Sequence, residues 1–338
     1  MAPVPALQVP QITRIALAPR VPDAAQRQSR NWVGEIGRLS AYHCNAAANP
    51  SATPQPFART RDTRPSTMIA KLTIAGLEHK FELDRGVSLA IATDFGATGL
   101  QHFGAPAPVS QPLAVGSFTG EVASGASANC RTISLTPHCS GTHTETAAHL
   151  LQDPSDAWRV VPKGLVPAAV ISVAPEPARE TSESTTPAPW GTDILITERR
   201  LRAAFTRNRP FTPRALIVRT LPNDPAKKSG QYGHEIPPYF TLEAATWLVA
   251  HNVQHLVLDV PSLDRIQDDG KLTAHRIFFG LPAMSRAAAD VARPTCTVTE
   301  LAFVPDELAD GSYALSLAVP AIGGDAVPSQ PILYPYHK

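Results

Sequence analysis

The amino-acid sequence predicts a mixed α/β domain built on a mixed sheet, and three observations favour this fold class. Short apolar runs at residues 168–173, 215–218 and 255–260 have the length and composition of buried strands. A helical segment at residues 242–251 leads directly into the last of these runs, whereas neighbouring segments elsewhere alternate between polar and apolar residues. The 34 prolines disfavour long helices, which argues against coiled coils and helical bundles.

The first elements after the N-terminal region are strands. Residues 71–83 alternate polar and apolar side chains on both sides of Ala75 and Gly76, which predicts a hairpin that turns at this pair. Residues 87–92 form a further apolar strand candidate, and residues 130–135 alternate. Adjacent strands of this kind indicate a sheet that is not wholly parallel.

Two helices are predicted between the later strands. Thr197 is placed to cap a helix at residues 198–205, and Thr241 a second helix at residues 242–251. A threonine hydroxyl at such a position accepts a hydrogen bond from a backbone N–H of the first helical turn. Residues 175–192 are polar and rich in proline, which predicts a loop.

Composition and charge exclude several classes of function. The 30 Lys and Arg residues oppose 29 Asp and Glu residues, so the formal charge of +1 gives no bulk reason to expect a nucleic-acid partner. No stretch approaches 18 consecutive apolar residues, so we expect no membrane span. Four widely spaced cysteines do not make a disulfide framework, and the first residues do not resemble a secretory signal; both favour a reducing, cytoplasmic location.

Residues 1–67 differ in texture from the rest of the chain. They contain no lysine, eight arginines and three acidic residues, with much proline and alanine. We expect a disordered extension; translated sequence upstream of a start at Met68 is the second interpretation, and an arginine-rich organelle presequence is the third. Residues 68–338 are then one enlarged domain.

Chemically active side chains concentrate in residues 137–150, which read PHCSGTHTETAAHL. Cys139, His143, Glu145 and His149 are each able to bind a metal ion or to transfer a proton. A glycine between the cysteine and His143 allows a tight turn that brings the two together. A thiolate, an imidazole and a carboxylate can share one divalent ion; chance clustering of packed residues is the alternative.

The run GTHTETAAH resembles the H-x-G-T-H-x-D-x-P-x-H motif of the cyclase family, which includes bacterial kynurenine formamidase and isatin hydrolase. On this resemblance His143 and Glu145 correspond to metal ligands and His149 to the general base. Cys139 stands where the family has its first histidine ligand, and Ala147 where it has proline. A thiolate at the first position favours zinc over manganese or magnesium.

His138 is the alternative to Cys139 as the first ligand. The sequence favours Cys139, because on a strand a shift by one residue turns the side chain to the opposite face.

The resemblance continues downstream. Residues 255–264 resemble the family's central strand and its D-x-P-S-x-D turn, with Asp264 as a turn residue, and residues 311–333 resemble the C-terminal strands. On this resemblance His275 and Glu300 correspond to later metal ligands. Read alone, His275 indicates a histidine bonded to the backbone and Glu300 a surface strand position.

Some loop residues are weaker candidates for a substrate pocket, with packing inside the loops as an equal alternative. They are Tyr239, Phe240 and His234.

The resemblance implies a swivelling β/β/α fold, a homodimer or larger oligomer, and a small-molecule amide as substrate. The implied metal ligands are Cys139, His143, Glu145, His275 and Glu300, and the implied general base is His149. A divalent ion, with zinc first and manganese second, lowers the pKa of bound water to around 7. The implied reaction is therefore hydrolysis of a carbon–nitrogen bond in an amide, formamide or cyclic amide.

Two other functions stay open. Cys139 can act as a metal-free nucleophile with His149 or His138 as its base. The departures from the family motif also suit a chain that binds a small molecule without turning it over.

Overall fold

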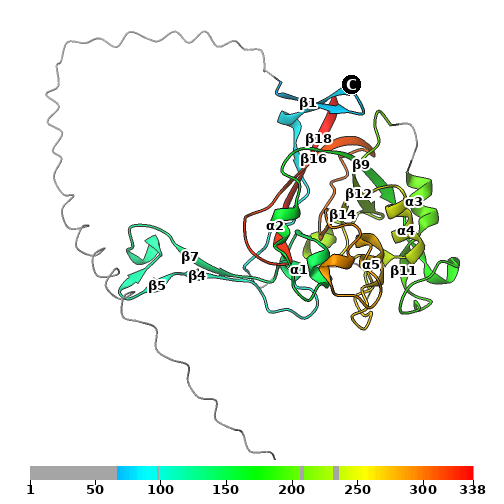
Figure 1. The fold of residues 1–338 in the computed structure, drawn as a ribbon. Helices are drawn as coiled ribbons and strands as arrows, with labels where there is room; N and C mark the ends of the chain where they lie inside the picture. The colour runs from blue at the N-terminus through cyan, green and yellow to red at the C-terminus, as the bar shows by residue number, and fades with distance from the viewer. Residues whose placement is uncertain (1–66, 97–98, 206–208, 231–235, 338) are drawn as a thin grey trace, which may run out of the picture. The chain divides into compact units, whose positions relative to one another are not determined.

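A large mixed sheet of eleven strands organises the part of the chain that the computed structural model describes (Figure 1). Residues 67–337 are described, except 97–98, 206–208 and 231–235. The described residues belong to one compact unit. The predictions made for residues 1–66 and for His234 lie outside the described residues.

The sheet has the order β1-β2-β18-β16-β9-β12-β14-β15-β8-β17, and β3 pairs with β18 off this path. Its strands are β1 (Ile69–Ile74), β2 (Leu77–Glu82), β3 (Val87–Ser88), β8 (His143–Glu145), β9 (Val166–Val173), β12 (Ala215–Thr220), β14 (His255–Leu258), β15 (Thr297–Glu300), β16 (Gly311–Ala318), β17 (Ala326–Pro328) and β18 (Gln330–His337).

The predicted hairpin is confirmed in β1 and β2. Ile74 pairs with Leu77 across a two-residue turn, in which Ala75 (φ 50°) and Gly76 (φ 84°) are both left-handed. Two consecutive residues of positive φ make the type I′ turn, whose twist matches that of the strands it joins.

The centre of the sheet explains the continuous apolar runs of the sequence. Strands β9, β12, β14 and β15 are parallel neighbours, and every residue of β12 is buried. Leu216 and Val218 face one hydrophobic core, whereas Ala215 and Ile217 face a second core on the other side. A strand with a core on each face has no polar side, so its sequence does not alternate. The mixed α/β fold class is thereby confirmed.

Helices cover one face of this sheet. Leu201 of α3 (Glu198–Ala204), Leu248 of α4 (Leu242–Ala250) and Phe278 of α5 (Thr273–Phe279) belong to the core that includes Leu216 and Val218. The Thr197 and Thr241 hydroxyls accept hydrogen bonds from the third residue of α3 and α4, at 3.3 and 3.1 Å, as the sequence predicts. No helix in the described ranges is long and apolar enough to cross a membrane.

Smaller elements lie outside the large sheet. They are the helical turns α1 (Pro137–Ser140) and α2 (Ala157–Val160), the pairs β4 (Val109–Pro112) with β7 (Arg131–Ser134) and β5 (Ala114–Val115) with β6 (Phe118–Thr119), and a sheet of β10 (Glu176–Pro177), β11 (Ile194–Ile196) and β13 (Tyr239–Phe240).

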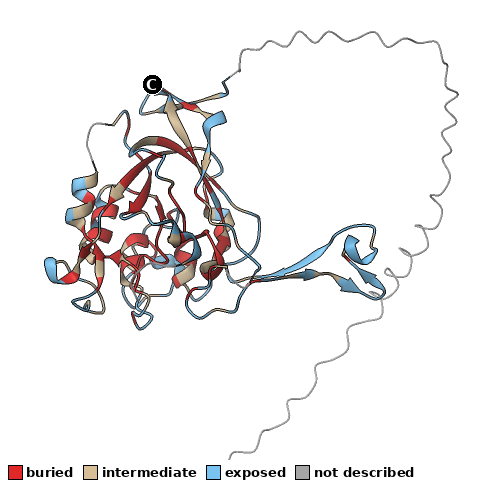
Figure 2. Ribbon diagram, turned by 180° about the vertical axis from the view of Figure 1, so that it is seen from behind, coloured by how far each residue is buried: buried red, intermediate tan, exposed pale blue. Residues whose placement is uncertain are grey.

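Three predicted segments differ in detail. The strand expected at residues 130–135 is present as β7, but it belongs to an exposed ribbon with β4 (Figure 2). The strand expected at residues 87–92 shortens to β3 and one further bridge from Ala90 to Ala302. The loop expected at residues 175–192 contains β10, because Glu176 pairs with Leu195 of β11.

Candidate metal centre

The short strand β8 is the middle of the site, because it is held on both edges. It pairs antiparallel with β15 on one side and with β17 on the other. His143 and Glu145 are two residues apart and therefore point to the same face. Glu300 of β15 is directly opposite His143, so it joins them on that face. All three side chains are buried.

The residues before β8 fix where the strand begins. A Cβ on Gly141 would lie 3.0 Å from the carbonyl oxygen of Ile91, so the close approach of this neighbouring segment requires glycine. The Thr142 hydroxyl accepts from the Ile91 N–H at 2.7 Å and donates to the Leu301 carbonyl. The Gly-Thr pair of the motif thus secures the strand against two other segments.

His138, rather than Cys139, lies beside Glu145. Its Nδ1 is 3.2 Å from Glu145 Oε2, whereas Cys139 is buried at 6% exposure and belongs to none of the groups of clustered ligand atoms in the described chain. His138 therefore replaces Cys139 as the candidate for the first metal ligand. The segment is the helical turn α1 and not a strand, so consecutive side chains differ by about 100° and not by 180°.

His275 enters the site from α5, and Asp264 aims it. The Asp264 carboxylate accepts hydrogen bonds from the backbone N–H groups of Ala274 and His275. It also forms a hydrogen bond of 2.7 Å with the ring nitrogen Nδ1 of His275. Asp264 is therefore more than the turn residue that its position in the sequence suggests. With Nδ1 occupied, Nε2 of His275 faces Glu145 Oε1 at 2.9 Å and Glu300 Oε1 at 3.4 Å.

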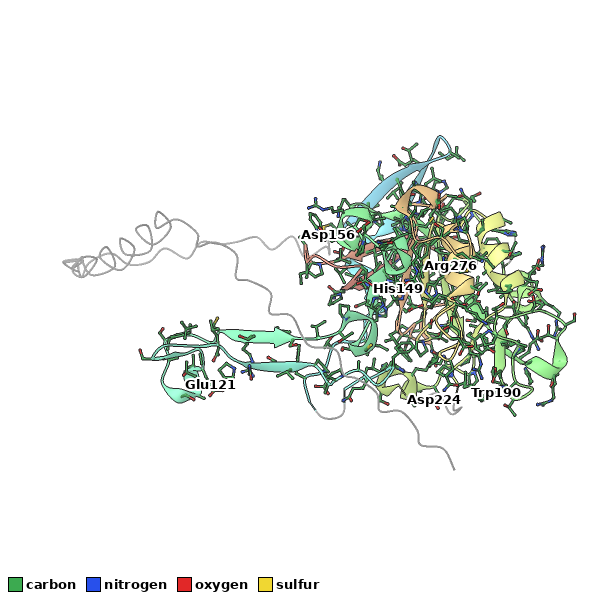
Figure 3. All side chains as sticks on the ribbon, turned by 60° about the horizontal axis from the view of Figure 1, so that its bottom comes forward. Glu121, His149, Asp156, Trp190, Asp224 and Arg276 are labelled. Carbon is green, nitrogen blue, oxygen red and sulfur yellow. The ribbon has the colours of Figure 1, made fainter. Side chains whose placement is uncertain are left out.

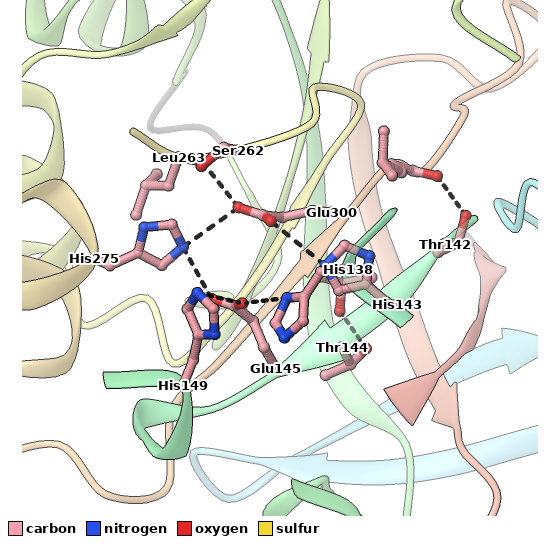
Figure 4. Close-up of polar contacts among 12 residues, drawn as sticks. His138, Thr142, His143, Thr144, Glu145, His149, Ser262, Leu263, His275 and Glu300 are labelled. Carbon is pink, nitrogen blue, oxygen red and sulfur yellow. Dashed lines mark hydrogen bonds and ion pairs between the residues drawn. The ribbon is translucent and has the colours of Figure 1, made fainter. Parts of the chain in front are cut away.

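Three buried ligand atoms converge without a hydrogen-bond partner among the described residues: His143 Nε2, Glu145 Oε1 and His275 Nε2. They lie close to carboxylate or imidazole atoms but are not aligned for hydrogen bonding (Figure 4). Buried polar atoms are rarely left without a partner, and lone pairs that converge in this way fit a cation. Among the described residues, three groups have ligand atoms within 4.8 Å of one another: His138, His143 and Glu145; Glu145, His275 and Glu300; and the less buried His138, His149 and Asp325.

The charges of the cluster also fit a bound cation. Burial raises the pKa of Glu145, but the positive charges of His149 and His275 outweigh it and hold this pKa well below its usual range. Burial lowers the pKa of His275, but Glu145 and Asp264 outweigh it and raise this pKa well above its usual range. The buried carboxylates thus require positive charge beside them, which imidazolium groups or a divalent cation can supply.

His149 lies at the open side of the cluster, on the short 3-10 helix Ala147–Leu150. Its side chain is 28% exposed, and its Nε2 is 4.0 Å from Glu145 Oε2. Figure 3 labels His149 within the compact body, away from Glu121 on the ribbon. A small molecule that approaches the buried ligands from solvent can therefore reach this imidazole.

Asp325 is a site residue that the sequence analysis missed. It precedes β17, whose Ala326 pairs with Glu145, so the sheet brings it next to the cluster. Its Oδ2 lies 2.9 Å from His138 Nε2 and 3.0 Å from His149 Nδ1. Hydrogen bonds from these two imidazoles hold the pKa of Asp325 well below its usual range. No local pattern around residue 325 signals this pairing, because it arises only from the contact of β17 with β8.

The predicted pocket residues Tyr239 and Phe240 are in the interior. Both are at most 2% exposed, in β13, and each packs in a hydrophobic cluster. The Tyr239 hydroxyl donates to Asp193 at 2.7 Å. Their assignment to a substrate pocket is therefore wrong, because the residues form a strand that pairs with β11 and not an open loop.

A profile of the protein family described as "Putative cyclase" matches residues 62–265, which is more than half of the chain. The chain belongs to this family. The cyclase match includes the segment with His138, His143, Glu145 and His149, and it ends before His275.

Solved structures are similar to this chain at low sequence identity. Isatin hydrolase A from Ralstonia solanacearum has 18% identity and a TM-score of 0.50, over 74% of this chain and 91% of that chain. A structure described as a potential metal-dependent hydrolase with cyclase activity has 13% identity and a TM-score of 0.49, over 74% of this chain and 97% of that chain. No curated protein sequence matches the chain.

Proposed function

We propose that this cyclase-family chain is a metal-dependent hydrolase that breaks the carbon–nitrogen bond of a small amide, formamide or cyclic amide. One observation carries the proposal: His143 Nε2, Glu145 Oε1 and His275 Nε2 are buried, converge, and have no hydrogen-bond partner in the described chain. Isatin hydrolase A, a structure of the same fold that is named as a hydrolase, agrees with it.

The ligand set consists of imidazoles and carboxylates. His138, His143, Glu145, His275 and Glu300 would hold the ion. When bound, a divalent ion polarises a carbonyl group and lowers the pKa of water. Glu300 is kept in place by the Leu263 N–H, which donates to its Oε1 at 2.8 Å, and His275 is kept in place by Asp264. Such fixed ligands need little reorganisation when substrate binds.

We assign the proton transfer to His149. Its Nδ1 faces Asp325, and its Nε2 is on the side of Glu145. Nε2 accepts a proton from water as the water oxygen bonds to the amide carbon, and returns it to the nitrogen as the carbon–nitrogen bond breaks. The products are a carboxylic acid and an amine, or one ring-opened molecule that carries both groups.

The geometry argues against a metal-free cysteine mechanism. Cys139 is buried, and burial raises the pKa of its thiol. A nucleophilic cysteine needs a lowered pKa and access to substrate. Binding without turnover stays as an outcome of the experiment below.

The test is metal analysis followed by an amide panel. Purified protein reconstituted with zinc or manganese is dialysed, its metal content measured, and its activity assayed on amides, formamides and lactams. We expect one or two ions per chain and turnover of at least one class. Protein that stays metal-free refutes the proposal, and bound metal with substrate binding but no turnover supports the non-catalytic alternative.

The role of His149 is tested by His149→Ala. We expect retained metal and a loss of kcat of about 10²–10⁴-fold, the usual contribution of a general base. His337→Ala, which changes an exposed histidine paired with Glu82, is the matched control. An unchanged rate in His149→Ala contradicts the base assignment.

A further inference from the structure

One carboxylate oxygen touches two histidines of the cluster. Asp325 Oδ2 lies 2.9 Å from His138 Nε2 and 3.0 Å from His149 Nδ1, and the two imidazole rings are 4.3 Å apart between centroids. An ionised carboxylate only accepts hydrogen bonds. Each imidazole nitrogen that faces Asp325 must therefore carry the hydrogen.

The opposite nitrogens both face the reaction centre. His138 Nδ1 is 3.2 Å from Glu145 Oε2, and His149 Nε2 is 4.0 Å from the same oxygen. A neutral imidazole has one N–H and one lone pair, so an N–H fixed toward Asp325 leaves the lone pair on the inner nitrogen.

We infer that Asp325 is a positioning residue that sets the tautomers of His138 and His149 together, so that His138 presents Nδ1 to a metal ion and His149 presents Nε2 to substrate water. This role rests on the proposed function, since it assigns a ligand and a base to that site. In this assignment Asp325 acts through the two imidazoles, and the alternative that it is itself a ligand, since the three side chains have clustered ligand atoms, is an outcome of the test.

The backbone holds Asp325 where this role requires it. Ala326 pairs with Glu145, so the residue before it lies at the end of β17 that borders the cluster. Its side chain is 39% exposed, and it contacts the imidazoles of His138 and His149. A partner of a metal-bound histidine typically contributes 10–100-fold to metal affinity.

The experiment compares Asp325→Asn with wild type in the zinc-loaded protein. An amide that turns its NH₂ group inward donates to the imidazole and stabilises the opposite tautomer. In wild type we expect ¹⁵N NMR to show protonated Nδ1 and unprotonated Nε2 for His149, and zinc bound to Nδ1 of His138. In the variant we expect mixed tautomers of His149 and a zinc affinity lowered about 10–100-fold. With a substrate in hand, kcat falls and KM changes little.

Asp306→Asn is the matched control, because the Asp306 carboxylate accepts from Asn223 and is exposed. It should leave both the NMR signals and the zinc affinity unchanged. The inference is overturned if wild-type His149 has the opposite tautomer, which needs no variant. It is also overturned if Asp325→Asn keeps wild-type tautomers and affinity, or if it loses a whole equivalent of zinc, which would make Asp325 a ligand.

NMR and zinc affinity do not depend on a substrate. If the amide panel yields no turnover while the tautomers respond to Asp325→Asn, the proposed reaction fails and the positioning role stands.

Discussion

Lys227→Met tests the buried ion pair beside the turn that carries Asp264. The Lys227 ammonium, 5% exposed, donates to Asp259 Oδ2 at 2.9 Å and to the Thr220 hydroxyl and carbonyl at 2.8 and 2.6 Å. Asp259 is fully buried and directly follows β14, in the segment that leads to Asp264. Methionine keeps the apolar stem and removes the charge, so the buried carboxylate loses its ammonium partner.

The structure gives the direction of the effect. Burial raises the pKa of Asp259 above its ordinary 3.8 even though Lys227 opposes the rise. Without the lysine this opposition is lost, so the pKa of Asp259 in the folded chain rises further. Breaking a buried ion pair by removing one partner costs about 3–5 kcal/mol, and we expect a loss of this size at pH 7.

The sign of the pH dependence follows from the raised pKa. A carboxyl group whose pKa is higher in the folded than in the unfolded chain favours folding at low pH, and this contribution is lost as pH rises from 3.8 toward the folded value. The variant should therefore be destabilised more at pH 7 than at pH 5, relative to wild type.

The assay is denaturant unfolding of both proteins at pH 5 and pH 7. Lys228→Met is the matched control, because Lys228 is the neighbouring lysine and is exposed. Its ammonium lies over the ring of Phe303. Loss of this contact should lower the free energy of unfolding by less than about 1 kcal/mol at either pH. A loss in Lys227→Met that equals the control, or that is the same at both pH values, refutes the reasoning.

Two further predictions concern histidines. Asp264→Asn should weaken metal affinity about 10–100-fold, because the amide no longer fixes His275 through Nδ1; a competition titration with a zinc chelator measures it, and unchanged affinity contradicts the role. Burial and the charge of Arg214 lower the pKa of His255 to about 4, so the folded chain resists its protonation. Between pH 6.5 and pH 4, protonation of His255 should lower the free energy of unfolding of wild type by up to about 3 kcal/mol. His255→Gln lacks this contribution, so its free energy of unfolding, measured by denaturant unfolding, should fall less over the same pH range.

Elements whose cause is local could be predicted from the sequence. The hairpin at Ala75 and Gly76 and the helices after Thr197 and Thr241 depend on residues within a few positions of one another, and all three are present. The extent of the strand after Val87 could not be predicted, because it depends on pairing with β18, about 240 residues later.

The candidate site divides in the same way. His143 and Glu145 share a face because successive side chains of a strand point to opposite faces. Glu300 and His275 are far from them in the sequence, and only the resemblance to the cyclase family predicted these two as ligands. Asp325 could not be found, since its contact with the cluster follows from the pairing of β17 with β8.

The exchange of Cys139 for His138 changes which metal chemistry the site offers, and it yields the last prediction. With the thiol outside the cluster, the donors are imidazole nitrogens and carboxylate oxygens, so a soft thiolate no longer selects zinc. Zinc still binds more tightly than manganese to such donors in general, and the metal found in cells depends also on supply. We expect Cys139→Ala to change zinc affinity less than twofold and His138→Ala to lower it at least tenfold. The reverse result would return the thiol to the ligand set, and it would mean that the helical turn of α1 presents residue 139 to the metal.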